Sequence, residues 1–283
     1  MRNASVDIYT RRKAVNIFNL TASAITTLIG LFFLSWLLWV LFEQGISHFD
    51  WNLLTLDTPG PGDETGGLRN AIVGSLLLTG VGVLIGAPVG VLAGTYLAEF
   101  GRYALISHAV RFINDVLLSA PSIVIGVFVY EIMVIPMGNF SGWSGAVALS
   151  IIVIPVVVRT TEDMMRLVPD SMREAAAALG APQWKIVTNV VLKAAISGVM
   201  TGILLAIARI AGETAPLLFT ALNNQFFTLN MDEPMSNLPV MIFNFAMGPY
   251  DNWHDLAWAG SLLITLTVLT LNILTRFLLR PKK

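Results

Sequence analysis

Two ionisable residues, Arg209 and Glu213, stand four positions apart inside an apolar run in the second half of the chain. At this spacing the two side chains share one face of a helix and can pair. An arginine in lipid costs about 2.5 to 3.5 kcal/mol on insertion scales, and such residues usually mark ion or substrate pathways. A guanidinium also presents forked donors that match the oxygens of an oxyanion. The pair therefore predicts an anion pathway, in which Glu213 neutralises Arg209 between anions and keeps binding weak enough for release.

Two other interpretations of this pair stay open. Arg209 and Glu213 could belong to an ion-coupled secondary carrier or channel for an oxyanion, working without any partner. They could also form a structural ion pair that only fixes helix packing in an assembly subunit. Asp115 and Glu131 are ionisable too, but they lie towards the ends of another apolar run, where water is within reach, and we leave them out of the site.

Catalytic and metal chemistry have little support in the sequence. The chain has no cysteine, and its three histidines, His48, His108 and His254, lack metal-ligand spacing. It contains neither a Gly-x-x-x-x-Gly-Lys-Ser/Thr loop for nucleotide phosphates nor a Gly-x-Ser-x-Gly nucleophile turn. We therefore expect no catalytic residue, no metal and no cofactor in this chain, so that any ATP is used by a partner. The formal net charge of −1 also argues against a nucleic-acid partner.

Membrane lipid is the expected surrounding of nearly the whole chain. Of its 283 residues, 55% are hydrophobic and only 12% are charged, against about 25% charged in soluble domains. A helix needs about 20 mostly apolar residues to cross a bilayer. Six segments meet this requirement: 17–42, 71–98, 112–136, 142–161, 196–222 and 256–279. The sequence therefore predicts an all-α membrane protein with six transmembrane helices and with Arg209 near the middle of the fifth.

The basic residues predict how the chain is oriented. Fifteen of the 17 Lys and Arg residues fall in the two tails and in the second and fourth loops, on one side of the expected spans. By the positive-inside rule both termini are cytoplasmic, which requires an even number of spans. The first apolar run is too long for a signal peptide and is expected to be a retained span. We therefore divide the chain into a cytoplasmic tail (1–16), a six-span domain (17–279) and a second cytoplasmic tail (280–283).

Glycine recurs every four residues in the second apolar run. The four positions are Gly82, Gly86, Gly90 and Gly94. Residues four apart form a slowly turning stripe on one helix face, and glycine there lets another helix backbone approach closely. The stripe predicts a helix-packing surface rather than a nucleotide loop, because no strand precedes it.

The fourth loop, residues 162–195, is polar but rich in helix-forming residues. Asp170 or Ser171 can cap a first helix, and Gly180 fits the left-handed position that follows a helix end. A second short helix is expected over 183–192. An alanine-rich rod with a sharp corner suits insertion into a groove on another protein, whereas the alternative is a hairpin that merely joins two spans.

This loop resembles the EAA loop of ABC-transporter permease subunits, through its stretch Glu174-Ala-Ala-x-x-x-Gly180. In that family the loop forms the coupling helix, which docks in a cleft of the cytoplasmic ATPase. The resemblance therefore assigns ATPase coupling to Glu174, Ala175, Ala176 and Gly180. The family pattern usually ends in Leu-Pro, whereas this chain has Leu192-Lys193 and so departs from the family at the entry to the fifth span.

Three further stretches extend the resemblance over most of residues 70–280. They are Ser119-Ala-Pro-Ser-Ile-Val-Ile-Gly126, the segment 204–219 around Arg-Ile-Ala-Gly-Glu-Thr-Ala-Pro, and Asn237-Leu-Pro239. Together they resemble the PstA family of permeases, which belong to bacterial phosphate importers of the type I ABC class. The resemblance implies a bacterial inner-membrane complex with a PstC-type permease, a PstB-type ATPase dimer and a periplasmic phosphate-binding protein. Phosphate rests on the resemblance alone, because an arginine could equally bind sulfate or another oxyanion.

Overall fold

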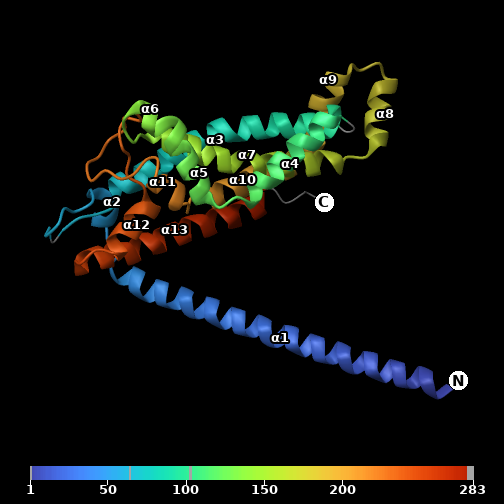
Figure 1. Ribbon diagram of the computed structural model, residues 1–283, viewed down its shortest axis with the longest axis horizontal. Helices are drawn as coiled ribbons and strands as arrows, with labels where there is room; N and C mark the ends of the chain where they lie inside the picture. The colour runs from blue at the N-terminus through green and yellow to red at the C-terminus, as the bar shows by residue number, and fades with distance from the viewer. Residues whose placement is uncertain (1, 64, 102–103, 279–283) are drawn as a thin grey trace.

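The structure is a computed structural model that describes residues 2–63, 65–101 and 104–278. Within these ranges every regular element is a helix, and the helices form an elongated bundle from which one long helix diverges (Figure 1). Five helices are long and apolar enough to cross a membrane, and a bent pair of helices supplies a sixth span. The expected all-α architecture with six spans is confirmed. The expected tail 280–283 lies outside the described residues.

Helix α1, Arg2–Ser47, is the longest element and stands apart from the bundle (Figure 1). Within Tyr9–Ser47 an 18-residue stretch has a mean hydropathy of 2.2, and only 6% of that stretch is buried. It meets the bundle near its carboxyl end, where Gly45 lies against Leu262 of helix α13, Asp251–Leu278. Most of α1 therefore faces surroundings that lie outside this chain, which suits a helix that is apolar on all sides.

Helices α3 (Arg69–Thr95) and α7 (Gly142–Arg166) pack side by side at the centre of the bundle. The residues of α3 that face α7 include Gly82, Gly86, Gly90 and Gly94. A Cβ atom added to Gly90 would lie only 2.7 Å from Cβ of Val157. From Gly82 to Gly94, each glycine contacts a residue that lies further along α7 than the one before, so the two helices run parallel. The glycine stripe is confirmed as a packing surface.

The third span is broken into two helices, and the single helix expected over 112–136 is wrong. Helix α4, Leu105–Ser119, makes an angle of 105° with the segment Ser122–Met137. That segment consists of α5 (Ser122–Val129), the π-helical turn η2 (Tyr130–Val134) and α6 (Ile135–Met137). The break follows from Pro121, because a proline disfavours the helical conformation in the residue before it, and Ala120 is extended with ψ 135°.

The fifth span begins and ends earlier than expected. It consists of α9 (Gln183–Lys185), the π-helical segment η3 (Ile186–Val191) and α10 (Leu192–Ile210), which follow one another without a break. The separate helix expected over 183–192 is therefore the first part of this span. The helix expected over 196–222 stops at Ile210 and is followed by a turn and the short helix α11, Ala215–Leu218. Pro216 stands in the first turn of α11, a position that suits proline, so it marks the start of this helix.

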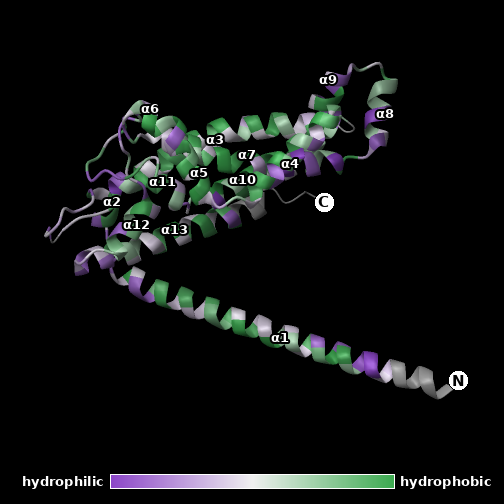
Figure 2. Cartoon of the chain, in the orientation of Figure 1, coloured by the Kyte–Doolittle hydropathy of each residue, from purple (hydrophilic) through white to green (hydrophobic). Residues whose placement is uncertain are grey.

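The remaining elements lie at the two ends of the bundle, which we name the α2 end and the α8 end (Figure 1). They are α2 (Asn52–Thr55), the π-helical turn η1 (Tyr96–Phe100), α8 (Asp170–Ala178) and α12 (Leu238–Ala246). Hydrophobic residues cover the bundle between these ends, and hydrophilic residues gather at α8 and in the loops of the α2 end (Figure 2). The largest buried cluster joins the long helices and includes Leu78, Leu149, Val153, Val157, Ile210 and Leu217.

Candidate anion site and coupling helix

Arg209 lies at the carboxyl end of α10, level with the middle of its neighbour α7. The register between the two helices is set by two contacts, Gly198 with Met164 and Gly202 with Thr160, which show that they run antiparallel. Arg209 is seven positions beyond Gly202 and is therefore level with Val153, seven positions before Thr160. The helix α7 extends over Gly142–Arg166. Arg209 is therefore level with the middle of α7, but it stands at the carboxyl end of its own span, Gln183–Ile210, and not near the middle of that span as expected.

The two ionisable side chains come together across the end of α10. Nε of Arg209 is 4.0 Å from Oε1 of Glu213, and 43% of the arginine side chain is exposed against 17% of the glutamate. The predicted pairing is present, but the contact is at the outer limit of an ion pair. A loose partner leaves the forked donors of the guanidinium available to a bound anion.

The backbone beside the pair is irregular at mid-depth, in residues 211–214. A Cβ atom added to Gly212 would meet no atom within 4 Å, so this turn borders open space in the single chain. On its other side the turn is held by α11, where Pro216 packs against Gly126 of α5. Two broken helices thus meet next to Arg209. Within a bilayer such backbone occurs only where it is buried in protein or lines a water-filled cavity.

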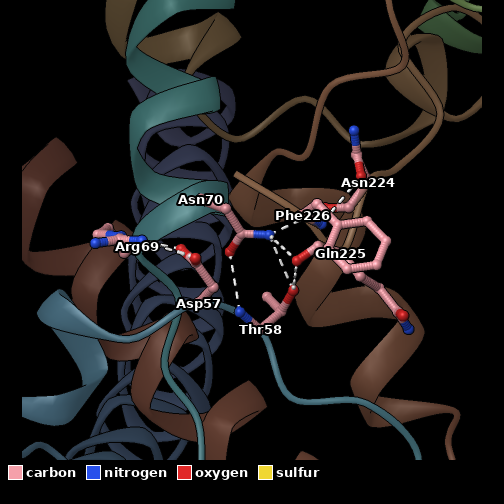
Figure 3. Close-up of polar contacts among 7 residues, drawn as sticks. All are labelled: Asp57, Thr58, Arg69, Asn70, Asn224, Gln225 and Phe226. Atoms are coloured by element: carbon pink, nitrogen blue, oxygen red, sulfur yellow. Dashed lines mark hydrogen bonds and ion pairs between the residues drawn. The ribbon is translucent and has the colours of Figure 1, made fainter. Parts of the chain in front are cut away.

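An asparagine at the start of α3 ties two loops together at the α2 end (Figure 3). Nδ2 of Asn70 donates to Oγ1 of Thr58 at 2.9 Å and to the carbonyls of Asn224 and Gln225 at 3.0 and 3.1 Å. Its Oδ1 accepts from the backbone N–H of Thr58 at 3.2 Å. Asn70 is buried, so these hydrogen bonds replace the ones to water that its side chain cannot make. They anchor the loop that follows α11. In the sequence, these contacts are indicated only by a polar residue at the start of an apolar run.

The residues that the EAA resemblance assigns to coupling lie on and just after α8, which projects from one end of the bundle (Figure 1). Glu174 and Ala175 are exposed, whereas Ala176 is partly buried against the apolar cluster beneath the helix. Leu179 and Trp184 are exposed beside the corner. Helix α8 thus packs on the bundle partly through Ala176 and presents charged and apolar groups outward.

The corner after α8 is formed by Gly180, whose φ of 77° confirms the expected left-handed conformation. No neighbouring atom crowds this glycine, so only the backbone conformation requires it. The expected cap by Asp170 or Ser171 is wrong. Pro169 precedes the first helical residue and no side chain caps α8. Asp170 is itself helical and pairs with Arg173 at 3.1 Å.

Arg173 fastens α8 to the bundle, a role that no spacing in the sequence indicates. Its Nη2 lies 2.6 Å from Oε1 of Glu99, and the two side chains are only 16% and 8% exposed. It also donates to the carbonyls of Val168 and Met165, at 2.6 and 2.9 Å. The hydrogen bond with Glu99 raises the pKa of Arg173 above its already basic value. The arginine therefore stays charged at physiological pH, and its titration does not loosen α8.

A second buried carboxylate, Glu162 on α7, ties α4 to the same end of the bundle. It accepts from Nε of Arg111 at 2.8 Å, and Nη2 of Arg166 lies 2.6 Å from the same oxygen. Arg111 also donates to the carbonyl of Leu97 at 3.1 Å. The side chain of Arg111 therefore joins α4 to α7 and to η1 at the α8 end.

Solved structures share this fold. The chain superposes on a permease chain of the bacterial alginate ABC transporter, solved with a periplasmic protein bound to an alginate pentasaccharide, with a TM-score of 0.68 at 15% identity, covering 93% of this chain and 94% of that one. For the inward-facing MetNI methionine ABC transporter the TM-score is 0.57 at 20% identity, covering 74% and 90%. At these identities the likeness shows the fold, which is that of type I ABC importer permeases.

Relatives in sequence are much closer. The phosphate transport system permease protein PstA of Haemophilus influenzae is 55% identical over 272 residues, covering 96% of each chain. PstA 1 of Mycobacterium tuberculosis is 35% identical over 270 residues, covering 93% of this chain and 88% of that protein. A family model described as "Binding-protein-dependent transport system inner membrane component" matches residues 86–280. The chain therefore belongs to the family of inner membrane components of binding-protein-dependent transport systems.

Proposed function

We propose that this chain is a permease subunit of an ATP-driven importer of inorganic phosphate, and that Arg209 and Glu213 line its passage. The observation that carries the proposal is an arginine left 43% exposed at mid-depth, beside a broken helix. The names of relatives up to 55% identical supply the anion. Because the guanidinium faces out of this chain, the passage forms against a second permease subunit rather than within one chain.

The orientation belongs to the same proposal. With the α8 end in the cytoplasm of a bacterium, both termini are cytoplasmic and the α2 end faces the periplasm. A periplasmic phosphate-binding protein would then deliver the anion at the α2 end. The outward loops there are fixed in place by Asn70, which gives such a partner a rigid surface.

We assign the coupling of transport to ATP hydrolysis to a partner ATPase that binds α8. The exposed Glu174 and Ala175, with Gly180 at the corner, form the surface that enters a groove of that partner, while Ala176 seats α8 on the bundle. Movement of α8 passes to the spans through Arg173 and rocks them as rigid bodies around the passage. This chain then needs no nucleotide site of its own.

The test is Arg209→Gln in the complete importer. We expect phosphate uptake to be lost while the amounts of co-purified permease and ATPase subunits stay unchanged, since the substitution removes the positive charge and the forked donors but leaves the packing residues of α10 in place. Arg209→Lys is the matched control and should keep partial uptake, because it preserves the charge. Competition with sulfate decides which oxyanion the passage accepts. Wild-type uptake by the Arg209→Gln importer would remove Arg209 from the pathway, and poor complex recovery would favour the packing interpretation.

A further inference from the structure

The chain between α11 and α12 forms a closed loop at the α2 end. The backbone N–H of Met235 donates to the carbonyl of Ala221 at 3.0 Å, so residues 222–234 leave the bundle and return to it at one place. We call residues 222–234 the α11–α12 loop. Its first residue, Leu222, has a left-handed φ of 56°, which turns the chain sharply at the start of the loop.

Hydrogen bonds fix the α11–α12 loop on two sides. On one side, Asn70 of α3 donates to two of its carbonyls, as described above (Figure 3). On the other side, the backbone N–H groups of Gly142 and Trp143, at the start of α7, donate to the carbonyls of Glu233 and Met231 at 3.0 Å each. The loop therefore presents its side chains from a fixed backbone. A partner that binds them loses little affinity to ordering the loop.

Two apolar side chains of this loop point away from the bundle. Phe226 is 80% exposed and Leu229 is 60% exposed. The neighbouring Phe227 is held differently, because Cζ of Arg69 lies over its ring at 5.0 Å from the centroid, and Arg69 in turn donates to Asp57. Phe226 and Leu229 thus form an apolar contact surface on a rigid support.

The loop lies outside the hydrocarbon core of the bilayer. The span that begins with α3, Arg69–Phe100, has 32 residues and is about 48 Å long, whereas the core is about 30 Å thick. Centred on the core, this span extends about 9 Å beyond it at each end. Asn70 holds the loop in the first turn of α3. Lipid tails therefore do not cover Phe226, and a protein is the better occupant.

The position and charge of the loop indicate which protein this is. The loop is bonded to Trp143, ten positions before the residue of α7 that is level with Arg209, so it lies about 15 Å outward of the arginine. Its own charged side chains, Asp232 and Glu233, are acidic and repel a bare phosphate ion. A protein that carries the anion can approach where the bare anion is repelled. The family of this chain is described as binding-protein-dependent.

We propose that the periplasmic phosphate-binding protein docks on the α11–α12 loop, with Phe226 and Leu229 as apolar anchors. This inference rests on the proposed function. A few well-packed residues, aromatic ones above all, dominate the energy of most protein interfaces. The carrier therefore offers an apolar pocket to Phe226, and docking places it above Arg209.

The first experiment measures how tightly the purified, phosphate-loaded binding protein binds the complete importer in lipid nanodiscs. Phe226→Ser should weaken binding about 30-fold, as truncation of a central aromatic anchor does, and Leu229→Ser should weaken it less. Leu105→Ser is the matched control, since Leu105 is 89% exposed at the α8 end, and it should leave the affinity unchanged. Wild-type affinity for Phe226→Ser overturns the inference. Loss of the second permease from the Phe226→Ser complex also overturns it, because the loop would then contact that subunit.

The second experiment identifies what covers Phe226. The chain has no cysteine, so a photo-crosslinker can be attached at one chosen position. Attached to Phe226→Cys, it should join the importer to the added binding protein, and attached to Leu105→Cys it should not. Crosslinks from residue 226 to lipid alone, or to the second permease alone, would contradict the inference. Failure of the unmodified importer to take up phosphate would instead overturn the proposed function, whatever the affinity of the binding protein.

Discussion

In the proposed passage, we expect Glu213 to set how firmly an anion is held beside Arg209. Its carboxylate lies 4.0 Å from the guanidinium, near enough to neutralise the cation and too far for a tight hydrogen bond. An arriving anion competes with this carboxylate for the same donors. We therefore propose that the pair balances capture against release, and we expect removal of the acid to shift that balance towards capture.

The variant Glu213→Gln tests this balance. We expect the maximal uptake rate to fall at least about fivefold, because an unneutralised arginine holds the anion longer, while the phosphate concentration for half-maximal uptake falls or stays the same. Glu213→Asp is the control that keeps the charge. An unchanged maximal rate would show that Glu213 has no part in release.

The spacing of Arg209 and Glu213 predicted a pair on one continuous helix; the pair is present, but Glu213 lies past the end of α10, in the irregular turn 211–214. The exposure of the arginine could not be predicted, since it depends on which elements surround the end of α10. Arg173 and Glu99 are 74 positions apart, and no local pattern links them. Contacts of that kind come only from the arrangement of whole helices.

At the scale of elements, α3 and α7 depend on close backbone contact. Gly90→Ala places a methyl group 2.7 Å from Cβ of Val157 and should destabilise the helix pair by about 1 to 3 kcal/mol. Gly80→Ala is the matched control on the same helix, because its added methyl group meets no atom within 4 Å. Thermal unfolding of the purified complex in detergent should give a lower melting temperature for Gly90→Ala than for Gly80→Ala. Equal melting temperatures would contradict the packing role of the stripe.

The attachment of α8 should matter more for coupling than for assembly of the spans. Arg173→Met leaves Glu99 buried without its partner, which costs about 3 kcal/mol, and loosens α8 from η1. We expect ATP hydrolysis to continue while phosphate transported per ATP falls. Combining Arg173→Met with Glu99→Leu should recover stability but not coupling. Normal coupling in the single variant would mean that force passes by another route.

The corner at Gly180 separates a coupled permease from an autonomous carrier. An alanine at φ 77° costs about 1 to 2 kcal/mol, so Gly180→Ala should reorient α8 and its exposed surface. Uptake in a coupled permease should then fall together with phosphate-stimulated ATP hydrolysis. An autonomous carrier should keep its uptake.

Apolar composition predicted where the spans lie but not where they break. The runs 112–136 and 196–222 look continuous because helical and non-helical segments inside a membrane share the same residue types. The signals for the breaks are local: Pro121 in the third span and Pro216 in the fifth. A proline alone is ambiguous, since Pro155 lies inside α7, which continues past it. Packing against neighbouring helices decides which prolines end a span.

At the scale of the whole molecule, the orientation can be measured directly. Single cysteines introduced by Lys185→Cys and Thr65→Cys lie at the α8 end and the α2 end, and both positions are exposed. In intact cells an impermeant thiol reagent should label residue 65 and spare residue 185, which should react only after the membrane is opened. The reverse pattern would place the α8 end outside and contradict ATPase coupling there.

The placement of α1 relative to the bundle was beyond prediction, because a helix that is apolar on all sides gives no hint of which side contacts a neighbour. The contact of Gly45 with Leu262 fixes one end only. This arrangement has a consequence for synthesis on the ribosome. Since α1 needs almost nothing from later parts of the chain, it can settle in the bilayer as soon as it emerges. The nascent protein is then tethered before its bundle has begun to form.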